Sequence, residues 1–193
     1  MYSVNKELII RSSSEAVDFA LLKDGKLIEL HKEQETSNFQ VGDIFIAKIR
    51  KPVAGLNAAF VNVGYEKDAF LHYHDLGPNL ASQLKFIKLV SAGKIKDFSL
   101  KNFQFEKEID KDGTITDVLN ANQSVLVQVV KEPISTKGPR ISAELSLAGR
   151  FIVLVPFSDR VSISQKIEDK KEKDRLKKLV QSIKPKGFGV IVR

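Results

Sequence analysis

The chain has 193 residues, 42% of them hydrophobic and 28% charged, so its length suits one domain or two small ones with a real core. It contains no cysteine, which excludes disulfides, thiolate metal sites and cysteine nucleophiles and fits a cytoplasmic protein. The formal net charge of +7 favours an anionic partner such as nucleic acid or an acidic membrane face, although a merely soluble basic protein shows the same excess, and neither a membrane span nor a signal peptide is visible.

The first 35 residues are predicted to form strands of a sheet. Short apolar runs occur at 7–11, 16–22 and 27–30, and the last two are separated by Lys23-Asp24-Gly25-Lys26. Asp-Gly between apolar runs is a strong hairpin signal, because the tight turn needs positive φ and glycine allows it. A polar joint at 33–38 follows.

A denser β region comes next and predicts a small barrel. Its short apolar runs are 44–49, 58–63, 68–72 and 124–130, separated by glycine-containing turns. Lys48 is expected near the end of the first of these strands. Residues 76–117 interrupt the barrel with a mixed segment, part of which is predicted to be helical.

The pattern becomes helical over 169–183. Leu176, Leu179, Val180 and Ile183 recur at spacings of three and four, which places them on one face of a helix. The helix is expected to end at 184–187, which contains a proline and a glycine. The chain then ends on an apolar strand without a closing turn, which suggests an incomplete chain.

Strand alternation singles out two phenylalanines of the barrel. Ala59, Val61 and Val63 share one face of their strand and Phe60 the other, while Phe70 and His72 lie opposite Ala69 and Leu71. Aromatic rings beside lysines such as Lys48 are how oligonucleotide-binding barrels hold single strands, with bases on the rings and cations at the phosphates. The alternative is that both rings belong to the core or cover a neighbouring domain.

Two basic segments are weaker candidates. The loop 131–140 carries Lys131, Lys137 and Arg140 and would clamp a phosphate backbone, or it is a solvated hairpin tip. Segment 166–186 has nine Lys or Arg and four Asp or Glu, a net of +5, and is either an RNA site or a solvated helix face.

Three other motifs resemble known binding sites but are incomplete. Residues 108–113 resemble the start of a calcium loop, but Leu119 stands where the bidentate acid is needed. His72 and His74 have no cysteine or third histidine near in sequence to complete a zinc site, and 187–189 is not a dinucleotide fingerprint. No catalytic and no metal-binding residues are therefore predicted in this chain.

An ordered series of short motifs resembles the ribonuclease E/G family. The series begins with Gly55–Gly64 and Ala69–Leu71, which look like the S1-type barrel motif of that family. After these come, in family order, residues 127–132, 136–138, 145–150, 163–168 and 189–193. Each piece alone is weak, whereas the ordered series is specific, and ribonuclease G is slightly favoured over ribonuclease E.

The resemblance implies an α+β, mainly β fold in three parts. Residues 1–38 resemble strands of a partial ribonuclease-H-like subdomain, into which an S1-type oligonucleotide-binding (OB) barrel at 39–143 is inserted. Residues 144–193 resemble an α/β region that senses the 5′-monophosphate end of an RNA. The nuclease domain of the family, with its carboxylates and magnesium, lies outside this chain.

The resemblance also assigns residues. Phe60, Phe70 and Lys137 match RNA-contacting positions of the barrel, joined by Lys48 from strand alternation. The 5′-phosphate pocket would be formed by Gly149, Val153, Lys166 and Arg193. Other members have arginine where Gln165 and Lys166 stand, and lysine offers a point charge rather than a planar fork.

The function implied is that of the RNA-binding amino-terminal part of a cytoplasmic, single-strand-specific endoribonuclease in RNA processing and decay. This chain alone is expected to bind single-stranded RNA without cutting it and to hold no cofactor, with magnesium needed by the whole enzyme. Strands without partners at 1–35 are expected either to favour self-association or to fold back against the 5′-sensor region. The alternative is a free-standing S1-type RNA-binding module in translation.

Overall fold

The computed structural model describes residues 5–13, 16–34, 39–95, 99–134 and 137–193. The chain divides into two compact units, residues 1–38 and 39–193, and each unit is considered by itself. None of the helices within the described ranges has both the length and the apolar character needed to cross a membrane.

The first unit is an antiparallel sheet in the order β1-β2-β3. Its strands are β1 (Lys6–Ser12), β2 (Ala16–Lys23) and β3 (Lys26–Gln34). Asp24 and Gly25 connect β2 to β3 with φ angles of 50° and 74°, the positive values that a two-residue hairpin turn requires. The hairpin expected from the Asp-Gly pair is therefore confirmed.

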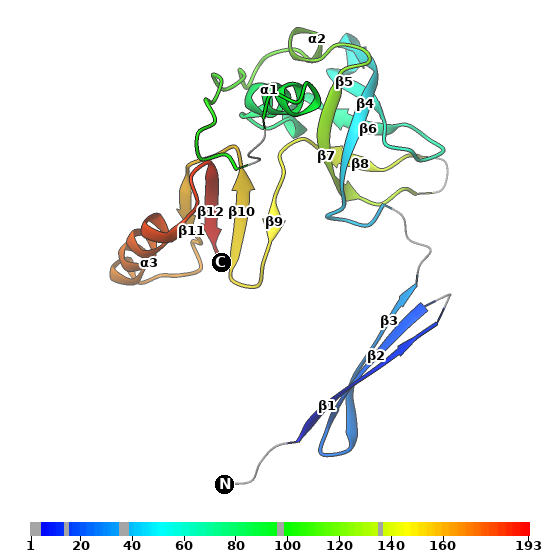
Figure 1. The fold of residues 1–193 in the computed structure, drawn as a ribbon, viewed down its shortest axis with the longest axis vertical. Coiled ribbons are helices and arrows are strands. Elements are labelled where there is room, and N and C mark those ends of the chain that lie inside the picture. The colour runs from blue at the N-terminus through cyan, green and yellow to red at the C-terminus, as the bar shows by residue number, and fades with distance from the viewer. Residues whose placement is uncertain (1–4, 14–15, 35–38, 96–98, 135–136) are drawn as a thin grey trace. The chain divides into compact units, whose positions relative to one another are not determined.

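The second unit begins with a closed barrel in the order β4-β5-β6-β8-β7 (Figure 1). Its strands are β4 (Ile44–Val53), β5 (Ala58–Asn62), β6 (Ala69–His72), β7 (Ser124–Lys131) and β8 (Arg140–Ser142). Neighbouring strands are antiparallel except β6 and β8, which are parallel. This strand order is that of an OB-like barrel.

The strand β4 is longer than the sequence pattern indicated. It continues to Val53, so the expectation that Lys48 lies near the end of the first strand was wrong. A bulge between Ile49 and Lys51 bends the strand, which lets its first half pair with β7 and its second half with β5. The short strand β8 was not predicted, because three residues carry no detectable periodicity.

The expected alternation of faces in the barrel is confirmed. Val61 and Leu71 are fully buried, and Ala59, Val63 and Ala69 on the same faces are also buried. The barrel core continues into β4, β7 and β8, where the buried hydrophobic side chains are Ala47, Ile49, Val125, Val127, Val129 and Ile141.

The segment that interrupts the barrel closes one part of its core. It contains the helix α1 (Leu80–Ser91) and most of the short helix α2 (Ile115–Val118). The 3-10 helix η2 (Tyr73–Asp75) directly precedes this segment, and another 3-10 helix, η1 (Ala54–Leu56), precedes β5. Leu80 and Ile115 are buried in the same core cluster as the barrel strands. Buried Gln83 fixes α1 further, because its Nε2 donates to the carbonyl of Ala143 at 3.0 Å. The predicted helical part is thus α1.

A second sheet follows the barrel, in the order β11-β12-β10-β9. Its strands are β9 (Leu147–Ala148), β10 (Ile152–Pro156), β11 (Val161–Ile163) and β12 (Phe188–Val192). Strands β11 and β12 are parallel and are joined through the helix α3 (Lys170–Ile183), whereas β10 is antiparallel to both neighbours (Figure 1).

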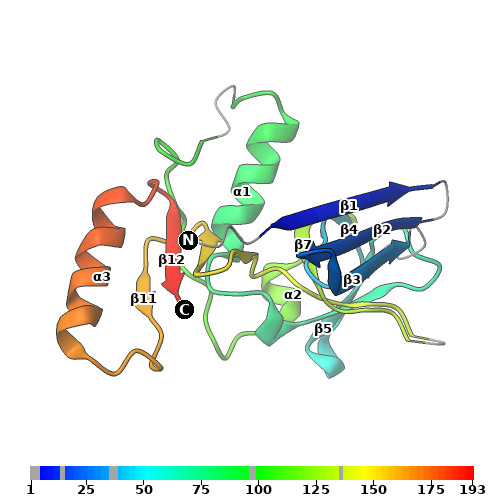
Figure 2. The same ribbon diagram turned by 90° about the horizontal axis from the view of Figure 1, so that it is seen from below.

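Helix α3 packs lengthwise against this sheet (Figure 2). Asp169 caps its start by accepting a hydrogen bond from the backbone N–H of Lys171 at 2.9 Å. Leu176 and Val180 contact the sheet, but Leu179 and Ile183 are 46% and 71% exposed. The predicted apolar face is therefore wider than the surface that the small sheet covers.

Phenylalanines connect the interrupting segment to the second sheet. Phe86 of α1 meets Phe103 and Phe157 edge to face, with ring centroids 5.6 Å apart in both pairs. Phe105 adds a further ring to this cluster, with its centroid 5.3 Å from that of Phe103. Phe157, which follows β10, is 6% exposed, so this cluster holds α1 against the end of β10.

Candidate nucleic-acid interface

A row of cations and aromatic rings crosses the outside of the barrel. Strand register pairs Lys51 with Phe60, Phe60 with Phe70, and Phe70 with Arg140, so the row passes through β4, β5, β6 and β8. Directly paired residues of neighbouring strands lie on the same face of a sheet. This outer row, Lys51-Phe60-Phe70-Arg140, thus places two rings between two cations on the face opposite the core.

The two rings of the outer row form one continuous apolar surface. Phe60 and Phe70 meet edge to face, with centroids 6.1 Å apart and planes inclined by 69°. Phe60 is 36% exposed, and neither ring belongs to the buried core cluster of the barrel. A base can therefore reach these rings without disturbing the core.

Lys48 lies on the same outer face but further along the barrel. It pairs with Asn62 in the strand register, and its Nζ donates weakly to the carbonyl of Asn122 at 3.4 Å. Its partner Asn62 is two residues from Phe60 on β5, so Lys48 lies on the outer face but outside the outer row.

The loop after β7 lies against the start of β6. The carbonyl of Pro139 accepts a hydrogen bond from the N–H of Phe70 at 3.1 Å, and Lys137 forms a bridge with Ile134 near the loop tip. Arg140 donates twice to one carboxylate oxygen of Asp75, from Nε at 3.1 Å and from Nη2 at 2.8 Å. Of the cations expected to clamp phosphate there, Arg140 is thus already paired, while Lys137 is exposed.

The four residues predicted for the 5′ pocket belong to segments that meet at one edge of the second sheet. Gly149 begins the turn from β9 to β10, and its N–H donates to the carbonyl of Ile152 at 2.8 Å. The N–H of Arg193 donates a hydrogen bond to the carbonyl of Phe151 in this turn at 2.8 Å. The carbonyl of Val192 accepts one from the N–H of Ser164, also at 2.8 Å. The end of β12 therefore lies between the β9–β10 turn and the segment that contains Lys166.

Positive charge gathers at this edge of the second sheet. The parallel strands β11 and β12 end there, and α3 starts after β11, so the positive end of its dipole is on this side. Arg193 and Lys166 are exposed, whereas Val153 is only 6% exposed. Ligands of α/β sheets commonly bind beyond the carboxyl ends of the strands, which is the position of these cations.

Two features were not identified as site elements from the sequence, one beside the barrel rings and one in the β9–β10 turn. His72 and His74 continue the line of rings from Phe70, although alternation had already placed His72 on the face of Phe70. Arg150 stacks over the ring of Phe151, 5.0 Å from its centroid, and Phe151 is 67% exposed. Phe151 gave no signal, because a lone aromatic residue beside a turn has no periodic partner.

An acidic hollow of about 710 Å³ lies next to His74. Its walls include the carboxylates of Glu108, Asp110, Asp112 and Glu144. Tyr73 also lines the hollow and donates its hydroxyl to the carbonyl of Asp110 at 2.5 Å, and burial raises the pKa of this phenol. Within the described ranges, no three His, Asp or Glu side chains are grouped as a metal ion would require.

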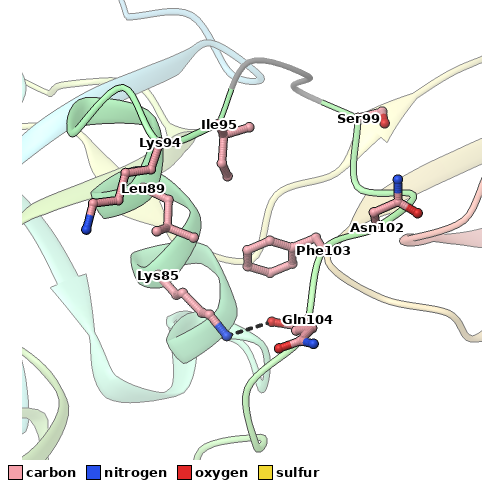
Figure 3. Close-up of a pocket in the computed structure, with 8 residues that line it drawn as sticks. All are labelled: Lys85, Leu89, Lys94, Ile95, Ser99, Asn102, Phe103 and Gln104. Carbon is pink, nitrogen blue, oxygen red and sulfur yellow. Dashed lines mark hydrogen bonds between the residues drawn. The ribbon is translucent and has the colours of Figure 1, made fainter.

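A second hollow, of about 380 Å³, lies between α1 and the chain at 99–104 (Figure 3). The ring of Phe103 points towards α1, and the Nζ of Lys85 lies 5.6 Å from the centroid of that ring. The same ammonium donates to the carbonyl of Gln104 at 3.0 Å and pairs with Glu106 at 2.6 Å. Through these contacts, Lys85 holds the chain at 99–104 against α1, and its ammonium is already occupied.

Comparison with known proteins gives a consistent result. Residues 146–193 match the model of the ribonuclease E/G family. Ribonuclease G of Salmonella typhimurium is 31% identical over 187 residues, which are 97% of this chain and 34% of that protein. Ribonuclease E of Nostoc sp. is 36% identical over 82% of this chain and 19% of its own length, and a ribonuclease E/G-like protein of Pyropia yezoensis is 38% identical over 81% and 26%. The chain thus spans about a third or less of the length of these relatives.

Proposed function

Since the chain belongs to the ribonuclease E/G family, we propose that it is the RNA-binding amino-terminal part of a single-strand-specific endoribonuclease of RNA processing and decay. The observation that carries this proposal is the outer row, in which Phe60 and Phe70 lie side by side between cations on an OB-like barrel. The activity of the whole protein is part of the proposal, because the chain spans 34% of the ribonuclease G relative.

The barrel would act as an S1-type RNA-binding domain. Bases of a single strand would stack on Phe60 and Phe70, each contributing about 1–3 kcal/mol, while Lys48 and Lys137 neutralise phosphates. Paired bases are already stacked on each other, so a duplex would gain little from the rings. This arrangement therefore favours single-stranded over double-stranded RNA without selecting a sequence.

The edge of the second sheet would bind the 5′-monophosphate of the RNA. Arg193 and Lys166 supply charge there, and the start of α3 adds the positive end of a helix dipole. Gly149 would keep the turn beside these cations tight, because a Cβ at that position would lie 3.1 Å from the carbonyl oxygen of Ile152. Buried Val153 would form the apolar floor of the pocket.

The sheet of the first unit would be part of a ribonuclease-H-like subdomain. Its strands leave two edges, and large apolar side chains are exposed along them: Leu8, Ile9, Ile10, Leu27, Ile28 and Leu30 are each more than half exposed. Exposed edges recruit further strands. We therefore expect this chain, when isolated, to self-associate through residues 1–35, which light scattering over a range of concentrations would measure.

Magnesium belongs to the proposal for the whole enzyme, which we place in the cytoplasm. The described residues of this chain do not offer the grouped carboxylates that a catalytic magnesium needs, so no step through the metal is assigned to them.

A free-standing S1-type module of translation is the second candidate. Its barrel would look the same, but it gives no reason for a match to the ribonuclease E/G family at 146–193, outside the barrel. A preference for RNA with a 5′-monophosphate over the same RNA with a 5′-hydroxyl supports the ribonuclease assignment, and equal affinity supports the module.

Titration of a labelled single-stranded oligoribonucleotide tests the proposal directly. We expect saturable binding that weakens as salt rises, because phosphate contacts release counterions. A duplex of the same sequence should bind more weakly. Absence of binding at low salt, or equal affinity for the duplex, contradicts stacking on the outer row.

A further inference from the structure

The rings on the outside of the barrel do not stop at the phenylalanines. Phe70 lies 6.4 Å from His72, and His72 lies 5.1 Å from His74, with planes tilted by 37° and 38°. Together with the Phe60–Phe70 contact at 6.1 Å, this makes an unbroken line of rings, the ring track Phe60-Phe70-His72-His74. Such spacings between centroids are those of rings in contact.

The histidines take their place for a local reason. Phe70 and His72 are two residues apart on β6 and so share its outer face. η2 then turns the chain, and the Nδ1 of His72 accepts a hydrogen bond from the N–H of His74 at 3.2 Å. This bond helps to fix the His72 ring beside Phe70.

Charges along the ring track differ between its two ends. At the phenylalanine end, strand register places Lys51 and Arg140 beside the rings, and Arg50 and Arg140 are paired with Asp68 and Asp75. Beyond His74, the acidic hollow presents Glu108, Asp110, Asp112 and Glu144, together with the cations Lys111 and Arg160. A phosphate backbone is attracted to the first end and repelled from the second.

We propose that His72 and His74 extend the base-stacking surface of the barrel, so that a single RNA strand lies along the ring track and leaves it at the acidic hollow. Histidine rings stack on unpaired bases as phenylalanine rings do. The inference rests on the proposed RNA-binding function and adds to it a place for the nucleotides that follow the two held by the phenylalanines.

His72 also caps η2, so the test must separate its ring from its cap. His72→Asn keeps a side-chain acceptor for the N–H of His74 but removes the ring, whereas His72→Phe keeps a ring and removes the acceptor. His74→Ala removes the last ring of the track and leaves that backbone donor in place. All variants are made in the whole chain and compared by melting temperature and by titration with a single-stranded oligoribonucleotide of about ten nucleotides, within the site size of one such barrel.

Stacking predicts that His72→Asn and His74→Ala raise the Kd by about fivefold or more, while His72→Phe stays near the original value. The opposite order, with His72→Asn unchanged and His72→Phe weakened, shows that His72 acts only as a cap and overturns the proposal. Unchanged affinity in both His72→Asn and His74→Ala overturns it as well. Phe60→Ala serves as the reference variant. If it weakens binding while the histidine variants do not, the barrel binds RNA without the two histidines, and the inference is wrong. If the original chain does not bind RNA at all, the proposed function itself has failed.

Discussion

The ring of Phe60 meets the ring of Phe70 edge to face across β5 and β6, with centroids 6.1 Å apart, on the face of the barrel that points away from the core. Because successive side chains of a strand point to opposite faces, burial of Ala59, Val61 and Leu71 on the inside requires these rings to lie outside. The apolar surface outside the barrel is thus a direct consequence of the packing inside it.

Replacing Phe60 with alanine should weaken RNA binding far more than it weakens the fold. Loss of a stacking ring costs about 1–3 kcal/mol of binding free energy, and Phe60 is already 36% exposed. Leu71→Ala is the matched control, because Leu71 is fully buried and its truncation should cost about 2–5 kcal/mol of unfolding free energy. Titration beside thermal melting separates the two, and a large loss of melting temperature in Phe60→Ala would show that its ring is structural.

Arg193→Ala should reduce the preference for a 5′-monophosphate over a 5′-hydroxyl on the same RNA. A hydrogen bond to a charged group contributes about 1.5–3 kcal/mol, and the hydroxyl-ended RNA should bind as before. Arg175→Ala is the control, since Arg175 lies on the surface of α3 and is paired with Glu172 at 2.7 Å. Equal losses for both RNA ends would instead identify Arg193 as a general contact to the phosphate backbone.

Asp159 should make the fold sensitive to acid. Its carboxylate accepts a hydrogen bond from Lys184 at 2.9 Å, which, with the N–H of Gly187, holds the pKa of Asp159 below its ordinary value. A lowered pKa contributes stability that is present above the unfolded value, near pH 4, and is lost as the pH falls through the folded value.

The expected size of this effect is small. Asp159 is 66% exposed, so screening limits the contribution to about 1 kcal/mol or less. Chemical denaturation of Asp159→Asn should show a slightly lower unfolding free energy at neutral pH and a difference from the original chain that shrinks as the pH falls below about 4. A difference that persists unchanged at acid pH would assign the effect to packing.

Gly187→Ala should destabilise the second unit strongly. Gly187 has a φ of +82°, and a Cβ there would lie 2.4 Å from the Cβ of buried Leu100. Left-handed backbone and overpacking together cost about 2–5 kcal/mol. Gly93→Ala shares the positive φ of +65° but meets nothing within 4 Å, so it should lose only about 1–2 kcal/mol in the same denaturation experiment.

The sequence by itself determined the features that depend on neighbours along the chain. Alternation identified the outer faces of β5 and β6, the Asp24-Gly25 pair identified the hairpin, and the periodicity over 169–183 identified α3. These patterns are local, because strand and helix periods arise from the backbone geometry of consecutive residues. The ordered motifs also identified the family before any contact was known.

Only the tertiary structure decided what depends on residues far apart in the chain. The parallel pairing of β8 with β6 joins Arg140 to Phe70, and the same fold pairs Arg140 with Asp75, whereas Lys137 stays exposed. The crossover through α3 brought the end of β12 beside the β9–β10 turn, so the N–H of Arg193 bonds the carbonyl of Phe151 in the turn that Gly149 begins. The small sheet left Ile183 uncovered although its helical period was correct. Such outcomes follow from chain closure and from the area that each surface can cover, and no local pattern carries that information.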